Sequence, residues 1–215
     1  MLSLAQAQFD AALDAATEAT RPAHEKVAML VEIAMGLQSR PRNAEDFLVA
    51  IRLYRQALNW AGEEAQVSQA RIRARLATAL HLRPGASAAE LEEAAELLQE
   101  SIPVLGADGA EEEAAEAELN LGLVLQEQAA AQPGLLAAAI AAYQRALRVF
   151  RAERYPAEFA LLHNNLATAY LAGAGAGPTG QVREALAVQS YQAALTKINL
   201  VDHPREYAML QNNLG

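Results

Sequence analysis

The chain has 215 residues, of which 53% are hydrophobic, enough to bury a continuous core, so the composition argues against a disordered segment. Its formal net charge of −9 opposes attraction to phosphate and argues against nucleic-acid partners, and the lack of cysteine excludes disulfides and thiolate chemistry. Alanine and leucine dominate the apolar residues and only 5% of the chain is aromatic, which favours helix over strand and predicts an all-α fold.

The N-terminus and the spacing of apolar residues predict where the protein resides. The first residues lack a basic start followed by an apolar run, and no apolar stretch approaches the roughly 20 residues that cross a bilayer. We therefore expect a soluble, cytoplasmic protein that does not bind membranes. Arginine greatly outnumbers lysine, and together with the alanine content this is typical of proteins from GC-rich bacterial genomes.

Apolar residues recur at helical spacing between helix breakers along the whole chain, and this pattern predicts helices. Pro133 and Pro156 are expected at helix starts, because proline is tolerated in the first turn. In chain order the predicted helices span about 2–20, 22–38, 43–61, 64–82, 87–104, 111–131, 133–152, 156–172, 180–199 and from 204 onward.

Every second helix contains a copy of one pattern, in which a small residue is followed by an aromatic and then by Ala-Leu. AIRLYRQAL begins at Ala50, AIAAYQRAL at Ala139 and AVQSYQAAL at Ala187. We name these helices type B. Their anchor residues lie 45, 44, 45 and 48 residues apart, and they are Phe9, Tyr54, Leu98, Tyr143 and Tyr191.

The intervening helices, which we name type A, share a leucine followed by a small residue that would let a neighbouring helix approach closely. Ile33 marks the earliest and weakest copy. The A-type leucines and the small residues after them are Leu76 and Ala77, Leu121 and Gly122, Leu166 and Ala167, and Leu214 and Gly215. The helices therefore form pairs over 22–61, 64–104, 111–152 and 156–199, preceded by a B helix at 1–20 and followed by a truncated A helix at 204–215.

Two motifs resemble the consensus of the tetratricopeptide repeat family: Leu-small-x-x-Tyr at 166–170 and Ala-x-x-x-Tyr-x-x-Ala at 187–194. The phrases RYPAEFALLHNNLATAY and DHPREYAMLQNNLG are similar to the longer repeats of kinesin light chains. The resemblance covers nearly the whole chain. It implies one α-solenoid domain over 1–215, a right-handed superhelix of antiparallel helix pairs with repeats of about 45 residues and a concave binding groove.

Asparagine recurs at one position of the A helices although it is a mediocre helix former. Asn120, Asn165 and Asn213 directly precede the A-type leucine, and Asn164 and Asn212 lie one residue earlier. The family resemblance implies that this position faces the groove, where an amide would hydrogen-bond a peptide backbone. The alternative is that these side chains bond between adjacent A helices and hold the stack.

Three further side chains are candidates for the groove. Arg75 occupies the same repeat position and Arg71 lies one turn before it, so both are expected to pair with an acidic group of a partner. The alternative is internal pairing with Glu63, Glu64 or the acidic run 111–118. His163 adjoins the asparagines and is expected either to line the groove or to pack between helices.

No pattern in the sequence is typical of catalysis. The glycines of 175–180 match a dinucleotide-binding fingerprint in spacing, but a helix precedes them where that fingerprint needs a strand, so we interpret this segment as a loop that lengthens the repeat. The acidic residues Glu111–Glu113 suit a helix N-terminus. We therefore predict that the protein is not an enzyme and has no cofactor. We also predict no metal site, because the spacing of the four histidines, His24, His81, His163 and His203, is not that of metal ligands.

The expected function is that of a scaffold or adaptor that binds a peptide or protein segment in the groove. Two alternatives stay open: self-association of copies through the ends of the solenoid, and a regulatory segment of a longer protein. The chain stops inside an A-type motif, so we expect the natural protein to be longer. Trp60 and Phe150, at the ends of B helices, are expected to pack between repeats.

Overall fold

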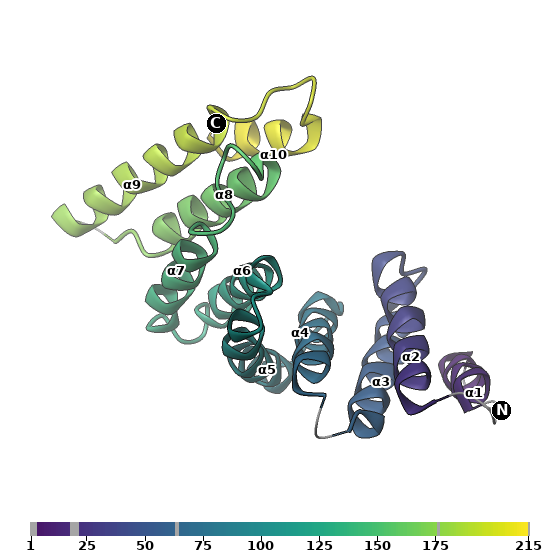
Figure 1. The fold of residues 1–215 in the computed structure, drawn as a ribbon. Helices are drawn as coiled ribbons and strands as arrows, with labels where there is room; N and C mark the ends of the chain where they lie inside the picture. Colours follow the sequence, from purple (N-terminus) through teal and green to yellow (C-terminus); the bar gives the residue numbers. More distant parts are fainter. Residues whose placement is uncertain (1–3, 18–21, 63–64, 176, 215) are drawn as a thin grey trace. The chain divides into compact units, whose positions relative to one another are not determined.

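The computed structural model describes residues 4–17, 22–62, 65–175 and 177–214 (Figure 1). Of these residues 79% are helical and none forms a strand, which confirms the all-α prediction. Within each of the two compact units described below, consecutive helices contact one another, consistent with an α-solenoid-like repeat array. The helices are α1 (Leu4–Thr17), α2 (Ala23–Ser39), α3 (Ala44–Trp60), α4 (Gln66–Leu82), α5 (Ala88–Ala107), α6 (Glu111–Gln128), α7 (Leu135–Ala146), α8 (Pro156–Ala172), α9 (Pro178–Leu195) and α10 (Pro204–Leu214).

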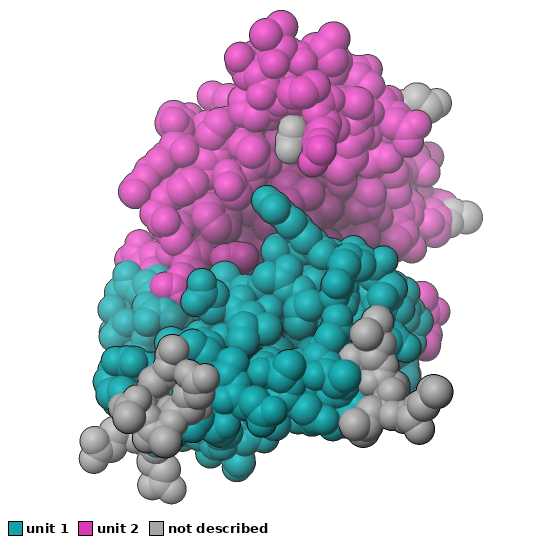
Figure 2. Space-filling view, turned by 90° about the vertical axis from the view of Figure 1, so that its right-hand side faces the viewer, with its two compact units in different colours: residues 1–110 teal, residues 111–215 magenta. Residues whose placement is uncertain are grey.

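The helices belong to two compact units, residues 1–110 and 111–215, which have different colours in Figure 2. Within unit 1, α2 packs on α3, α3 on α4 and α4 on α5, and α1 covers α2 and α3. Within unit 2, α6 packs on α7, α7 on α8, α8 on α9, and α10 on both α8 and α9. None of the described helices is long and apolar enough to cross a membrane.

Local signals explain where several helices begin. The side chain of Asn43 accepts hydrogen bonds from the first backbone N–H groups of α3, and Ser87 and Glu90 form a reciprocal capping box at the start of α5. Pro156 is the first residue of α8, as predicted. Glu111–Glu113 occupy the first turn of α6, where the helix dipole favours negative charge.

Among the helix ends that the structure describes, four helices depart by three residues or more from the predicted boundaries, and one of them, α6, ends at Gln128 instead of residue 131. α5 continues to Ala107 with Pro103 inside it, so the carbonyl of Gln99 has no helical N–H partner four residues on. α7 begins after Pro133, because Leu136 N–H bonds the Pro133 carbonyl in a tight turn, and ends at Ala146 instead of residue 152. α9 begins at Pro178 instead of residue 180 and ends at Leu195 instead of residue 199.

The chain after α7 turns inward because Phe150 enters the core. Its side chain is buried and its ring meets the Tyr155 ring edge-on, with 5.2 Å between centroids. If α7 continued to residue 152 as predicted, the turns at 147–154 could not form, and these turns place the Phe150 ring in the core. Trp60, the last residue of α3, is half-buried.

The repeat anchors that the structure describes form the core, as their spacing predicted, except Ile33 of α2, which is half-buried. All five B-type anchors are at most 9% exposed, and so are Leu76, Leu121 and Leu166 of the A helices. The side chain of Leu214 and the whole of Gly215 lie outside the described residues. The small residues after the A-type leucines serve close packing, because a Cβ at Gly122 would lie less than 3.0 Å from ring carbons of Tyr143.

Two buried tyrosines are joined to glutamines of the preceding A helix. The hydroxyl of Tyr54 donates to Oε1 of Gln38, and that of Tyr143 donates to Oε1 of Gln126, both at 2.9 Å. Burial raises the pKa of both phenols, to about 12 for Tyr54, so the hydroxyls remain protonated donors at neutral pH. Each glutamine lies five residues after its A-type anchor, so the same bond is made in two repeats.

Candidate functional site

The strongest candidate site lies in unit 2, between the A helices α8 and α10, which pack against each other. Helical spacing places Leu161 one turn before Asn164 and Asn165 on α8. On α10 the same spacing places Met209 one turn before Asn213. The apolar side chains and the amides of the two helices therefore form neighbouring layers of one interface.

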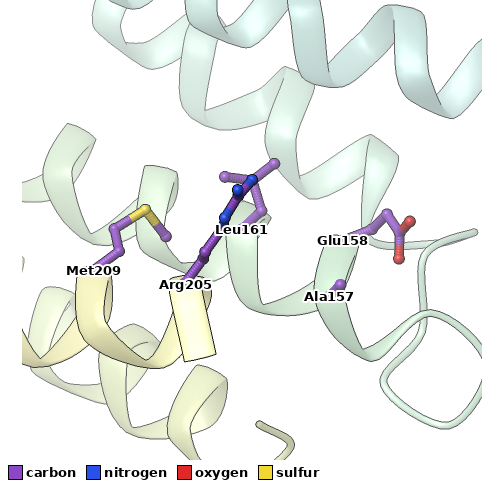
Figure 3. Close-up of a pocket in the computed structure, with 5 residues that line it drawn as sticks. All are labelled: Ala157, Glu158, Leu161, Arg205 and Met209. Atoms are coloured by element: carbon purple, nitrogen blue, oxygen red, sulfur yellow. The ribbon is translucent and has the colours of Figure 1, made fainter. Parts of the chain in front are cut away.

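A cavity of about 230 Å³ opens between these two helices (Figure 3). Leu161 and Met209 are the large apolar side chains of its lining, and both lie five residues before the A-type leucine of their helix. Ala157 and Glu158 of α8 and Arg205 of α10 complete the lining. The sequence signal that could have revealed this cavity is an apolar residue, Leu161 or Met209, at the same repeat position of two adjacent A helices.

The layer next to the cavity is an amide bridge between the two helices. Nδ2 of Asn213 donates to Oδ1 of Asn164 at 2.7 Å, and Nδ2 of Asn164 lies 3.4 Å from Oδ1 of Asn165. Asn164 is 6% exposed and Asn165 is 7% exposed. Bonding between adjacent A helices, one of the two roles considered for these asparagines, is therefore present for Asn164 and Asn213.

The amide nitrogen of Asn165 is buried and has no hydrogen-bond partner among the described residues. Its repeat position is that of Asn213, and the position equivalent to Asn164 on the preceding A helix, α6, is Leu119. A leucine offers no acceptor, which accounts for the unpaired donor. Direct contact between this nitrogen and a bound segment would require the Asn165 side chain to turn outward.

The remaining predicted asparagines are placed differently. Asn212 is exposed on α10, and Asn120 is half-buried on α6. The structure therefore brings three of the five asparagines, Asn164, Asn165 and Asn213, into one cluster.

The two predicted arginines lie in unit 1, on α4. Arg71 pairs with Asp108 at 4.0 Å, with both side chains partly exposed. This acid was not among the internal partners that the sequence suggested, and two of those, Glu63 and Glu64, lie outside the described residues. The positive charge of Arg75 acts on the hydroxyl of Tyr54, where it lowers the phenol pKa against the larger opposite effect of burial.

His163 packs against a neighbouring ring. Its imidazole centroid lies 4.3 Å from that of Phe159, and its Nδ1 is buried without a hydrogen-bond partner among the described residues. Burial lowers the pKa of this histidine, so it is neutral at pH 7.

The geometry also bears on cofactor and metal binding. Gly175 and Gly177 lie between helix α8 and helix α9, and Gly180 lies in the first turn of α9. The element before these glycines is a helix, as the sequence indicated, and not the strand that a dinucleotide fingerprint requires; Ala176 lies outside the described residues. Within the part of the chain that the structure describes, no three histidine or acidic side chains are grouped to hold a metal ion.

Comparison with known proteins leaves the sequence and the geometry as the basis for interpretation. No family model matches the chain, and no curated protein matches it.

Proposed function

We propose that this chain is a binding module of tetratricopeptide-like repeats that holds a peptide or protein segment along its A helices, as a scaffold or adaptor does. The observation that carries the proposal is the cavity between α8 and α10. It is open, apolar and next to a row of amides, which is the combination that anchors one side chain of an extended segment beside its backbone.

The lining favours a segment with one large apolar side chain. Leu161 and Met209 are half-buried without a partner segment, and a side chain of leucine or methionine size would cover both. Glu158 and Arg205 come from opposite helices, so each is placed to contact a polar group on either side of the apolar residue. Asn212 and Asn213 are the exposed amides nearest in sequence to this layer, and Asn164 fixes the position of Asn213.

The test is selection of short peptides from a random library displayed on phage, with the full chain immobilised. Peptides that bind are synthesised and their affinities measured by fluorescence anisotropy. Replacing Met209→Glu puts a charge in the cavity and should weaken binding by about tenfold or more, since burying an apolar side chain contributes roughly 1.5–3 kcal/mol.

The matched control is Val188→Glu, which introduces the same charge at a side chain that is 48% exposed on the B helix α9. It should leave peptide affinity within about twofold, which is less than 0.5 kcal/mol. Circular dichroism of both variants establishes that they are folded. If no peptide binds saturably, or if selected peptides bind the Met209→Glu variant as well as the unmodified chain, this function is wrong.

A second candidate function is self-association. Val182 and Val188 on α9, and Leu200 and Val201 in the turn after it, are exposed apolar side chains, with Val201 88% exposed. Copies that associate through these side chains would show a mass that rises with concentration in light scattering, and Val201→Lys would lower it. A strict monomer at all concentrations would remove this candidate.

A further inference from the structure

A second cavity, of about 600 Å³, lies at the opposite end of α8 from the first. Its walls are the turn after α6, the start of α7 and residues 172–175 at the end of α8, which contribute alanines, glycines, Pro133 and Leu136. Gln126 and Arg183 are its polar residues. A volume of this size is typical of sites for small organic molecules.

Arg183, on α9, is the charged side chain in the lining. It is half-buried, and its Nη1 donates to the backbone carbonyl of Gly173 at 2.7 Å. It forms no ion pair with any acidic side chain that the structure describes. A guanidinium carries five N–H donors, so most of its hydrogen-bonding capacity is not used by the described residues, and no acidic side chain among them neutralises its charge.

The backbone around Arg183 is shaped to hold the guanidinium in this place. A Cβ at Gly173 would overlap Nη1 of Arg183 and would also lie 2.8 Å from Cδ2 of Leu136. A Cβ at Gly180, one turn before Arg183, would overlap the carbonyl of Gly175. Glycines at these two positions therefore let the loop after α8 close on α9 with the arginine side chain between them.

The side-chain amide of Gln126 is already bonded to other residues of the fold and does not contribute to ligand binding. Its Oε1 accepts from Tyr143, and its Nε2 donates to Oγ1 of Thr168 at 3.2 Å. The chemistry that the cavity offers is thus an apolar surface with one oriented guanidinium.

We propose that this cavity binds a carboxylate carried on a small apolar group, with Arg183 as the carboxylate partner and the alanines, Pro133 and Leu136 as the apolar contact surface. Guanidinium and carboxylate match in shape and form paired hydrogen bonds. This inference is independent of the peptide site between α8 and α10, because the two cavities share no lining residue. The carboxylate could come from a free short-chain acid or from the C-terminus of a peptide.

The test is an NMR titration of the full ¹⁵N-labelled chain with three probes. Hexanoate represents a free acid, N-acetyl-leucine represents a peptide C-terminus, and N-acetyl-leucinamide has the same apolar group without the charge. We expect saturable shifts of the Gly173 and Gly175 amides and of the Arg183 Nε–H with at least one carboxylate probe, and none with the amide. Whichever carboxylate probe binds more tightly identifies the source.

Arg183→Gln should weaken binding of the carboxylate probe by about tenfold or more, since charge-assisted hydrogen bonds contribute roughly 1.5–3 kcal/mol. Arg148→Gln removes the same charge from an exposed position of unit 2 and should leave binding unchanged. Because Arg183 also caps α8, its variant is checked by circular dichroism. If it does not fold, the comparison of N-acetyl-leucine with its amide on the unmodified chain still decides.

The proposal is overturned if neither carboxylate probe binds, if the neutral amide binds as well as the acid, or if folded Arg183→Gln binds the acid with unchanged affinity. Each of these results would leave Arg183 with only its role at the end of α8.

Discussion

The pairs α4–α5 and α6–α7 occupy equivalent places in the repeat but hold their two helices together differently. In α6–α7, Arg145 and Glu118 form two short bonds, Nε–Oε1 at 2.5 Å and Nη2–Oε2 at 2.8 Å. In α4–α5 the charges are exchanged: Arg73 is on the A helix, Glu100 is on the B helix, and their closest approach is 3.7 Å.

The B-type anchors of the two pairs differ as well. α7 presents the ring of Tyr143 to Gly122, whereas α5 presents Leu98 to the helix that carries Ala77. Tyr143 also bonds Gln126, and the residue at the position of Gln126 in α4 is His81. The repeat therefore fixes which positions face each other, while the identity of each contact, including the sign of a charge, is set pair by pair.

Among the substitutions that test this comparison, Gly122→Ala is expected to have the largest effect on stability. The added Cβ overlaps the Tyr143 ring and should lower the free energy of unfolding by about 1–3 kcal/mol, the usual cost of overpacking a core. Combining it with Tyr143→Leu reproduces the residues of α4–α5 and should recover most of the loss. The measurement is urea denaturation followed by circular dichroism.

Gly36→Ala is the control for this change. Its added Cβ meets nothing within 4 Å, so the variant should gain up to about 1 kcal/mol from the better helix propensity of alanine. Equal destabilisation by Gly122→Ala with and without Tyr143→Leu would show that the ring is not what requires the glycine.

An intermediate effect is expected from removing one charge of each ion pair. Glu118 is 10% exposed in its side chain, so Glu118→Gln should cost about 1–2 kcal/mol, a value already reduced because Arg145 is 43% exposed. Glu100 is 64% exposed, so Arg73→Gln should cost less than about 0.5 kcal/mol.

Urea denaturation by circular dichroism measures both variants, and Trp60, the only tryptophan of the chain, reports unit 1 by fluorescence for Arg73→Gln. Exchanging the charges with Glu118→Arg and Arg145→Glu should recover much of the loss caused by Glu118→Arg alone. Equal costs for Glu118→Gln and Arg73→Gln would contradict the difference drawn between the two pairs.

The smallest effect concerns His163, which occupies in α8 the position of Glu118 in α6 and Arg73 in α4. Burial lowers its pKa in the folded chain below the ordinary 6.5. Its contribution to stability is therefore present above about pH 6.5 and is lost as the pH falls below it, because the unfolded chain then binds the proton more readily.

The melting temperature should consequently fall less between about pH 7.5 and about pH 5.5 in His163→Gln than in the unmodified chain. His24→Gln, at an exposed position of α2, should leave the pH dependence unchanged. An identical pH dependence in all three proteins would show that His163 does not couple protonation to folding.

The number and order of the helices and their buried anchors could be predicted because they follow from spacing along one chain. The bonds that Gln38 and Gln126 make to tyrosines of the next helix were not predicted, although each glutamine lies five residues after the A-type anchor of its helix. The Arg145–Glu118 pair was also missed, since it depends on how far one helix is turned toward the next, which spacing alone does not fix. The predicted helix over 87–104 already contains Pro103, but its continuation to Ala107 was not predicted, because proline usually ends a helix.

The candidate site was predicted in part for the same reason. The repeat predicted that Asn164, Asn165 and Asn213 lie at equivalent or adjacent positions of neighbouring A helices. Whether they bond one another or contact a ligand depends on the distance between α8 and α10, which the sequence does not give. The only signal of the first cavity was the shared repeat position of Leu161 and Met209, and the second left no signal in a single motif, because it is assembled from residues of different helices and turns.

The bridge from Asn213 to Asn164 has a consequence for how the repeats find their order during folding. Repeat helices of similar sequence are prone to docking on the wrong neighbour. If α10 docked on α6, Asn213 would face Leu119 and would lose its acceptor, at the cost of one hydrogen bond, roughly 0.5–1.5 kcal/mol. The Asn164 amide on α8 thus favours the correct order of the helices over an order in which α10 packs on α6, whereas the apolar anchors alone would fit both orders.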